Sequence, residues 1–504
     1  MGIVIRQSIK ASIASYIGIG IGIVNTLFIS LHFLSPNQVG LVAILFQASS
    51  FFAAFAQLGS PYVAAKFFPY FQTMENKGRG FLFFLLNFSL AGFIIFSILF
   101  FCFKTQLLNL FDEGKSPLLI KYAGFLLPFT FFLVFQSFLE SYCRIHSRIV
   151  VPSIIREIGL RIFNAILIFL YGFNFISFHS FIFLLIGSYG LAVLFLIIYI
   201  KWLGKLYLKP DFSPNNVKYF KEMIIFGIII VLGGLGSNVA TRIDSMMLSQ
   251  MKGESFVAIY LIAMFMAQVI EMPQRVVAQI STPIISKAWK DNQIFNVEEI
   301  YKKSATNLLI IGILLFLLIW CNIDEIFFLT PKSEIYKQGK TVVLCLGIAK
   351  IFDMGSGLHS EIIQYSKYFN FTILTVILLA ILTIISNLIF IPKYGVDGAG
   401  YAYLISYSIY AIIKIIFLWV KYKIHPFTKS TLLIVILSCS IFLLSYLFHF
   451  NSISKLSALI SIFIHSLFIT SIFGFSIYKL KISPEVNNIV DIGLDILKKK
   501  LKVY

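Results

Sequence analysis

The sequence has few charged residues for its length, and this scarcity argues against a soluble protein. Asp, Glu, Lys and Arg make up 12% of the 504 residues, whereas a soluble domain carries about a quarter. No stretch is polar enough to form a separate soluble domain. Hydrophobic residues account for 59% of the chain, in long runs that are rich in phenylalanine. This composition is typical of a protein that resides in a membrane.

The sequence also lacks the patterns that mark metal, disulfide and nucleotide sites. Its five cysteines occur without CxxC spacing, and its seven histidines are scattered. These distributions argue against a disulfide framework and indicate no metal site. The GxxxxGK[ST] loop of ATP-binding proteins is missing, which argues against ATP-driven transport by this chain. We therefore expect no cofactor and no catalytic site.

The net charge of +19 lies in the wrong places for a nucleic-acid partner. Lys and Arg are spread over short loops between apolar runs, which is the pattern of membrane-topology signals. We therefore expect membrane lipids as partners and no nucleic acid.

About fourteen apolar runs are long enough to span a bilayer, since a spanning helix needs about 20 mostly apolar residues. The sequence thus predicts an all-α, polytopic membrane protein with about 14 transmembrane helices. The runs lie near residues 9–31, 39–66, 81–103, 118–138, 150–172, 178–202, 223–247, 256–285, 306–328, 339–360, 369–391, 398–420, 430–449 and 456–478.

Prolines interrupt the two longest runs. Pro61 lies in the run 39–66, and Pro273 and Pro283 lie in the run 256–285. Because proline lacks a backbone donor and clashes with the preceding turn, we expect these helices to be kinked.

The basic residues of the loops indicate the orientation of the chain. With the N-terminus in the cytoplasm, 26 Lys and Arg residues fall on the inner side and 9 on the outer side. The positive-inside rule then places both termini in the cytoplasm. Every outer loop is too short to hold a folded domain.

Two halves of the chain resemble each other at a displacement of roughly 220 residues, with Pro61 opposite Pro283. We interpret them as two six-helix copies around a central cavity, related by an axis along the membrane normal. The predicted segments are an N-terminal bundle (1–222), a C-terminal bundle (223–428), an additional helix pair (429–480) and a cytoplasmic amphipathic tail (481–504).

We assign ten charged residues to the interior of the membrane spans, where charge is costly unless it faces a wet interior or an opposite charge. The acidic ones are Glu157, Asp244, Glu271 and Asp353. The basic ones are Arg156, Arg161, Arg242, Arg275, Lys350 and Lys414. Six bases against four acids leave the interior positive. We predict a water-lined cavity in which the bases bind a phosphate headgroup.

Local pairing offers a second interpretation of the same residues. Glu157 with Arg161 and Glu271 with Arg275 are four residues apart, and Lys350 with Asp353 three apart, so each pair shares a helix face. Such pairs could serve only to join helices. Arg156, Arg242 and Lys414 have no such neighbour in the sequence. The four acids are also candidates for coupling transport to protons or sodium.

Several segments resemble a known family. They are "LSPNQVGLVAILFQ" with "LGSPYVAAKFFP", then "SNVATRIDSMMLSQ" with "YLIAMFMAQVIEMP", and "LIFIPKYGVDGAGYAYLISY". Together they are similar to the Wzx-type polysaccharide flippases of the multidrug/oligosaccharidyl-lipid/polysaccharide (MOP) exporter superfamily. The last segment is the most telling, because its small residues permit close helix packing.

The resemblance implies fourteen helices and alternating access in the inner membrane of a bacterial cell. The implied activity is to flip undecaprenyl-diphosphate-linked oligosaccharide units for surface polysaccharide and lipopolysaccharide biosynthesis. The resemblance implies that Arg275 corresponds to arginines that line the cavity in other members of the superfamily. It also implies that Asp244 corresponds to a position where the family often has an acidic residue. The first two helices depart from some relatives because they contain no arginine, only Lys66. Contact with a polysaccharide polymerase stays open.

Two alternatives remain. A lipid II flippase of peptidoglycan synthesis belongs to the same superfamily, although the missing arginines of the first two helices count against it. A membrane-embedded polysaccharide polymerase or ligase is an enzyme of similar hydropathy. It would need a large outer loop with catalytic residues, and the outer loops around 104–117 and 329–338 are short.

Overall fold

A computed structural model describes residues 3–72, 80–109, 111, 115–210, 214–446, 454–488 and 490–492. Within these ranges the chain is helical and contains no strand. The predicted all-α class is therefore confirmed. The amphipathic tail predicted over 481–504 lies mostly outside the described residues, because nothing beyond residue 492 is described.

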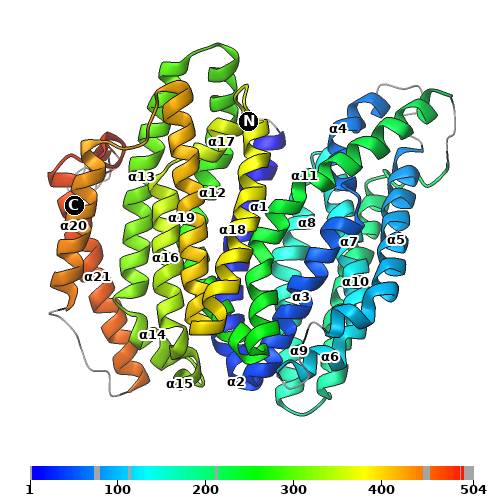
Figure 1. Cartoon of the computed structure of the whole chain (residues 1–504), viewed down its shortest axis with the longest axis horizontal. Helices are drawn as coiled ribbons and strands as arrows, with labels where there is room; N and C mark the ends of the chain where they lie inside the picture. Colours follow the sequence, from blue (N-terminus) through cyan, green and yellow to red (C-terminus); the bar gives the residue numbers. More distant parts are fainter. Residues whose placement is uncertain are drawn as a thin grey trace, which may run out of the picture. The chain divides into compact units, whose positions relative to one another are not determined.

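The α-helices follow one another along the chain with short connections (Figure 1). Their bounds are α1 Ile3–Val24, α2 Leu31–Phe33, α3 Pro36–Ala56, α4 Ser60–Gln72, α5 Phe81–Asn109, α6 Pro117–Tyr122, α7 Leu126–Ile145, α8 Val150–Ile154, α9 Leu160–Gly172, α10 Phe178–Trp202, α11 Pro214–Lys252, α12 Glu254–Lys290, α13 Ile294–Trp320, α14 Ile323–Leu329, α15 Ser333–Tyr336, α16 Lys340–Gly355, α17 His359–Gln364, α18 Asn370–Tyr394, α19 Val396–Tyr422, α20 Lys429–Tyr446 and α21 Lys455–Lys479.

Two π-helical turns interrupt the first and fifth predicted spans. They are η1 (Asn25–Ser30), between α1 and α2, and η3 (Ile155–Gly159), between α8 and α9. A π turn inserts an extra residue into a helix and is frequent at functional sites. Here η3 contains two of the charged residues predicted to lie within the membrane.

Ten helical segments of the described chain are long and apolar enough to cross a membrane, so the chain is a multi-pass membrane protein. The other four predicted spans are also helical but less suited to crossing. The span 150–172 carries three charges and a π turn, and the helices within 339–360 and 430–449 are short. The helix over 223–247 is described throughout, but the side chains of residues 232–241 are not. The count of fourteen therefore stays a prediction.

The kink expected at Pro61 is a full break. Helix α3 ends at Ala56, and α4 begins at Ser60. Between them, Leu58 and Gly59 have φ angles of 50° and 71°, which a right-handed helix does not allow. Pro61 lies in the first turn of α4, where a missing N–H costs nothing. By contrast, α12 runs without a break through Pro273 and Pro283.

The chain forms two compact units, Met1–Ala258 (unit 1) and Ile259–Tyr504 (unit 2). In unit 1, α7 packs against α3, α4 and α10, and α11 packs against α3 and α4. The predicted repeat assigns the span in α11 to the second copy, starting at residue 223, so unit 1 contains one span more than the first copy. The repeat concerns sequence similarity rather than packing, and it stays a prediction.

In unit 2, α19 packs along α18 on one side and also packs against α16. The predicted close approach at the start of α19 is present, because a Cβ on Gly398 would overlap the carbonyl of Phe390. Two hydrophobic clusters complete the unit, one around Tyr301 and Met354 and one around Phe473.

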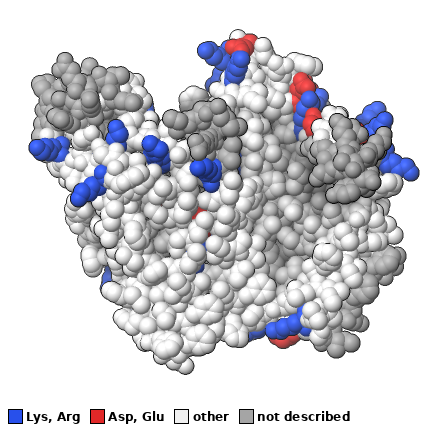
Figure 2. Space-filling model, turned by 180° about the vertical axis from the view of Figure 1, so that it is seen from behind, with Lys and Arg blue, Asp and Glu red and all other residues white. Residues whose placement is uncertain are grey.

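The charged side chains lie mainly near the helix ends. On the face drawn in Figure 2 most of the surface is uncharged, and the Lys and Arg side chains that are visible lie mainly near helix ends. Long uncharged stretches suit helices that cross a hydrocarbon core about 30 Å thick.

Candidate functional site

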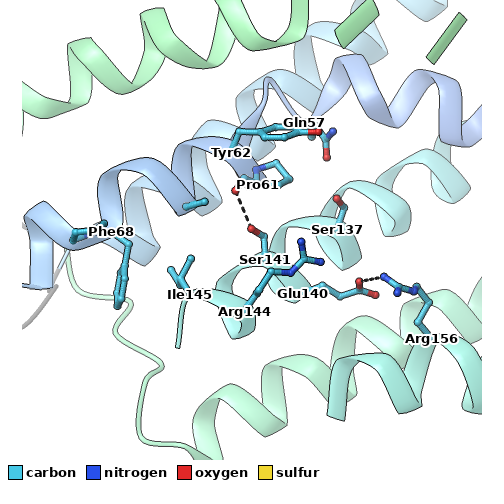
Figure 3. Close-up of a pocket in the computed structure, with 12 residues that line it drawn as sticks. Gln57, Pro61, Tyr62, Phe68, Ser137, Glu140, Ser141, Arg144, Ile145 and Arg156 are labelled. Carbon is cyan, nitrogen blue, oxygen red and sulfur yellow. Dashed lines mark hydrogen bonds and ion pairs between the residues drawn. The ribbon is translucent and has the colours of Figure 1, made fainter. Parts of the chain in front are cut away.

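Two polar cavities of unit 1 lie next to each other along α7. The α4–α7 cavity has a volume of about 580 Å³, and the α7–α9 cavity has a volume of about 430 Å³. Both are lined by Ser137, Glu140 and Arg156, and Figure 3 shows these residues together with Arg144. Arg144 lines the first cavity, and Arg161 lines the second. Three arginines and two glutamates therefore line the two cavities.

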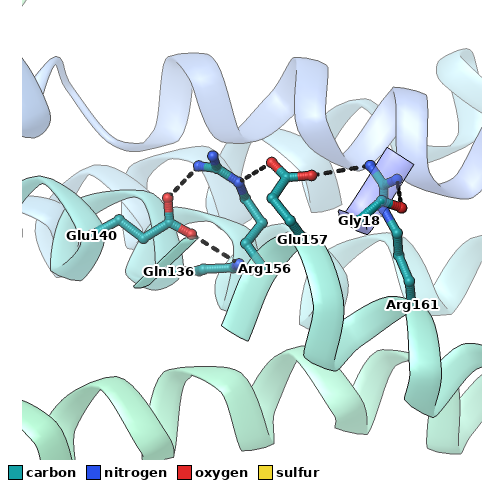
Figure 4. A network of polar contacts seen from close by, with 6 residues as sticks. All are labelled: Gly18, Gln136, Glu140, Arg156, Glu157 and Arg161. Carbon is teal, nitrogen blue, oxygen red and sulfur yellow. Dashed lines mark hydrogen bonds and ion pairs between the residues drawn. The ribbon is translucent and has the colours of Figure 1, made fainter. Parts of the chain in front are cut away.

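A chain of ion pairs joins these residues (Figure 4). Arg156 Nη1 lies 2.5 Å from Glu140 Oε2, and Arg156 Nε lies 3.0 Å from Glu157 Oε1. Glu157 Oε2 in turn lies 3.0 Å from Arg161 Nη2. Arg161 also donates to the carbonyl of Gly18, and Gln136 Nε2 donates to Glu140 Oε1 at 3.1 Å. Each carboxylate is thus held by at least two donors.

Helix geometry explains why these side chains meet. Gln136, Glu140 and Arg144 are four residues apart on α7 and so share one face. Arg156 and Glu157 lie in the π turn η3, which directs adjacent residues toward both α7 and α9. Arg156 is 45% exposed and Glu140 only 9%. The arginine is therefore accessible from the cavities, and its acidic partner is largely buried.

The structure confirms one predicted pair in unit 1 and adds two others. Glu157 pairs with Arg161, as the four-residue spacing predicts. Arg156 has no acid three or four residues away in the sequence, but it pairs with Glu140 of α7 and with the adjacent Glu157. The sequence reasoning missed Glu140 because the predicted span ended at residue 138. Helix α7 continues to Ile145, which keeps Glu140 and Arg144 in register with the cavity wall.

The other two predicted residues of unit 1 lie on α11 and line neither cavity. Arg242 Nη1 donates to Gln47 Oε1 at 2.7 Å, so its partner is an amide from α3. Asp244 is 1% exposed.

The remaining predicted residues belong to unit 2 and form two groups. In the first group, Arg275 Nε lies 3.2 Å from Glu271 Oε1, as predicted, and is 63% exposed. Lys350 pairs with Glu271 and not with Asp353 in its own helix. The three-residue pairing predicted for Lys350 was therefore wrong, because an acid of α12 lies closer.

The second group of unit 2 surrounds Lys414 and Asp353. Lys414 is 1% exposed and donates to Ser360 Oγ at 2.8 Å and to the hydroxyl of Tyr410. Asp353 Oδ2 accepts from Gln274 Nε2 at 2.9 Å, and its Oδ1 lies 3.5 Å from His359 Nε2. At this exposure, Lys414 cannot reach a ligand in the conformation described.

The arrangement in unit 1 can bind an anion by exchange. Arg156 is accessible, and its fork of N–H donors is occupied by carboxylate oxygens. A phosphate group offers the same planar pair of acceptors with more charge, so it can replace a carboxylate. Arg144 and Arg161 stand on either side to bind a second phosphate.

Comparison with protein families gives two matches. The family described as polysaccharide biosynthesis protein matches residues 4–289, which is more than half of the chain and includes every residue of the unit 1 cavities. The MatE family matches residues 230–389.

Individual proteins are similar to the chain in sequence or in fold. The chain is 25% identical over 362 residues to the uncharacterized membrane protein MJ1068 of Methanocaldococcus jannaschii, covering 69% of this chain and 67% of that protein. A structure of the lipid II flippase MurJ in an inward closed conformation is similar with a TM-score of 0.72 and 18% identity, over 95% of this chain and all of that one. An inward-facing multidrug resistance MATE family transporter of the MOP superfamily is similar with a TM-score of 0.62 and 18% identity, over 83% and 98% of the two chains.

Proposed function

Because the chain belongs to the polysaccharide biosynthesis protein family of MOP-type flippases, we propose that it flips undecaprenyl-diphosphate-linked oligosaccharide units for surface polysaccharide biosynthesis. The diphosphate binds in the polar cavities of unit 1, and the lipid tail stays in the bilayer. Alternating access then moves the headgroup to the outer leaflet. The chain acts as a transporter and not as an enzyme.

The observation that carries this proposal is the group of three arginines around two neighbouring cavities. Arg144, Arg156 and Arg161 exceed the acids Glu140 and Glu157 by one charge. A diphosphate would bind more than one guanidinium, since each phosphate accepts two parallel hydrogen bonds from an arginine.

The proposed location is the inner membrane of a bacterial cell, with both termini in the cytoplasm. The excess of Lys and Arg in the predicted inner loops, 26 against 9 in the outer loops, supports this orientation.

A lipid II flippase is the second candidate, and the similarity in fold to MurJ favours it. Lipid II also carries a diphosphate, so the cavities of unit 1 suit both substrates. Growth of cells depleted of their own lipid II flippase would separate the two, because only a lipid II flippase restores it. A polymerase or ligase would need a large outer loop with catalytic residues, and the predicted outer loops are short.

Substitution of single arginines in cells tests the proposal. We expect Arg156→Ala and Arg275→Ala to reduce surface polysaccharide severalfold while the protein stays at its normal level in the membrane. The Arg156→Ala variant loses the proposed contact with the phosphate. Arg275 is tested because it is the exposed basic residue of the first group in unit 2. Polysaccharide on the cell surface and protein in isolated membranes are both measured by immunoblot.

The matched control is Lys393→Ala, which removes one exposed positive charge at the end of α18. It should leave polysaccharide unchanged. Normal polysaccharide in both arginine variants contradicts the assignment of these residues to substrate binding.

A further inference from the structure

A third cavity of unit 1 lies where α7 and α10 end, and its polar lining residues follow the last residues of the two membrane-spanning segments. Its volume is about 290 Å³. Arg148, Lys205, His146 and Ser147 are its polar lining residues, and none of the seven lining residues is acidic. We call it the end cavity. It shares Phe68 and Ile145 with the α4–α7 cavity, so the two lie next to each other.

The two cations reach this cavity through equivalent helix caps. At the end of α7, Arg148 N donates to Cys143 O at 3.0 Å and Ser147 N to Arg144 O at 2.9 Å. At the end of α10, Lys205 N donates to Ile200 O at 3.1 Å and Gly204 N to Lys201 O at 2.9 Å. Both are Schellman motifs with a left-handed residue before the cation. The motif therefore places Arg148 and Lys205 at corresponding positions of two helices that pack together.

The polar groups of the end cavity lack partners within the described part of the chain. No described carboxylate forms an ion pair with Arg148 or Lys205. His146 Nε2 is buried and makes no hydrogen bond there. Burial, followed by the charge of Lys205, lowers the pKa of His146 to about 4. The imidazole is therefore neutral at physiological pH while the cavity is empty.

A helix C-terminus alone accounts for part of this arrangement, because its exposed carbonyls attract cations. That attraction explains why a base follows each cap. It does not explain why a buried imidazole nitrogen is left without a partner beside two cations. An anion satisfies all three groups at once, since it accepts from each and offsets their charge.

We propose that the end cavity is an anion subsite that binds the phosphate of a lipid headgroup. If the proposed function holds, this subsite receives the diphosphate first and passes it along α7 to Arg144 and Arg156. The same chemistry would bind an anionic phospholipid. The phosphate is held by Arg148 and Lys205, and His146 becomes its third donor.

Titration of His146 tests the subsite without any transport measurement. The full chain is labelled with ¹⁵N in its histidine rings and placed in phosphatidylcholine nanodiscs, and the His146 signal is assigned by its loss in His146→Gln. An anion beside the ring favours the imidazolium. We expect added pyrophosphate to raise the pKa of His146 by about one pH unit or more. The titratable or charged side chains beside the ring are those of Tyr142, Arg148 and Lys205.

Two double variants locate the effect. Arg148→Ala with Lys205→Ala should abolish the response to pyrophosphate. Lys201→Ala with Lys209→Ala removes the same charge from exposed positions of the same region and should preserve it. Arg156→Ala should also preserve it, which separates this subsite from the site of the proposed function.

A second arm identifies the source of the phosphate. Nanodiscs that contain phosphatidylglycerol, without pyrophosphate, raise the pKa of His146 if a membrane lipid occupies the subsite. A response to either probe that requires Arg148 and Lys205 supports the proposal. The proposal is overturned if neither probe changes the pKa of His146. It is also overturned if the change persists in the Arg148/Lys205 double variant, or if it disappears in the Lys201/Lys209 control.

Discussion

At the scale of single residues, Arg156 and Glu140 define the candidate site. Arg156 is the accessible member of the pair, and Glu140 is the buried one. A largely buried carboxylate is stable only while its charge is compensated. If a ligand displaces Glu140 from Arg156, the Glu140 carboxylate must therefore be protonated or accept hydrogen bonds from another donor. Ligand binding and charge balance are linked at this pair.

Replacement of Glu140 by glutamine should strengthen anion binding. The change removes the carboxylate that competes for Arg156, and glutamine can still accept a hydrogen bond. Removing one charge about 4 Å away changes the interaction by about 1 kcal/mol, or roughly fivefold in affinity. We expect Glu140→Gln to bind pyrophosphate severalfold more tightly, as measured by calorimetry in detergent, and to release substrate more slowly.

Glu222→Gln serves as its control, because Glu222 is an exposed acid of α11 that lines neither cavity. Its affinity for pyrophosphate should match that of the unchanged protein. Equal or weaker binding by Glu140→Gln would show that the glutamate does not compete for Arg156.

The sequence was a partial guide to these residues. Spacing of four within one helix predicted the pairs at Glu157 and Glu271, since both partners share a face. It could not predict Glu140 with Arg156, or Lys350 with Glu271, because these pairs join different helices. Which faces of two helices meet depends on packing, and an apolar sequence contains little information about it.

At the scale of helices, the small residues at the start of α19 are the most constrained. Gly398 approaches the carbonyl of Phe390 so closely that an added methyl group would overlap it. We expect Gly398→Ala to separate α18 from α19 and to destabilise unit 2 by about 1–3 kcal/mol. A lower melting temperature of the purified protein in detergent would show this.

Gly187→Ala in α10 is the matched change, since a Cβ at Gly187 meets nothing within 4 Å. The same methyl group there should leave the melting temperature close to that of the unchanged protein. A tolerated Gly398→Ala would refute the packing argument.

The elements themselves were largely predictable. Every apolar run that the sequence predicted as a span is mostly helical where it is described, with non-helical turns only at 57–59, 321–322, 356–358 and at the ends of runs. The break between α3 and α4 was not, because it depends on a positive φ at Leu58, a residue that gives no warning of it. The π turns at η1 and η3 were also missed, because the spacing of apolar residues does not distinguish a π turn from an α-helical turn.

At the scale of the whole molecule, transport against a concentration difference needs an energy source. The candidates for ion coupling are Glu157 in unit 1 and Glu271 and Asp353 in unit 2, with Asp244 buried on α11. We expect translocation in reconstituted vesicles to respond to a proton or sodium gradient. Rates that are equal with and without each gradient, measured in the same vesicles, would exclude this coupling.

The most direct test uses purified protein and lipid-linked oligosaccharide in phosphatidylcholine vesicles. The oligosaccharide becomes accessible to an added glycosidase only when it reaches the outer leaflet. The account predicts that the unchanged protein raises the accessible fraction with time, that Arg156→Ala slows this at least severalfold, and that Lys393→Ala does not. Accessibility that rises no faster with the unchanged protein than in protein-free vesicles would contradict the central claim.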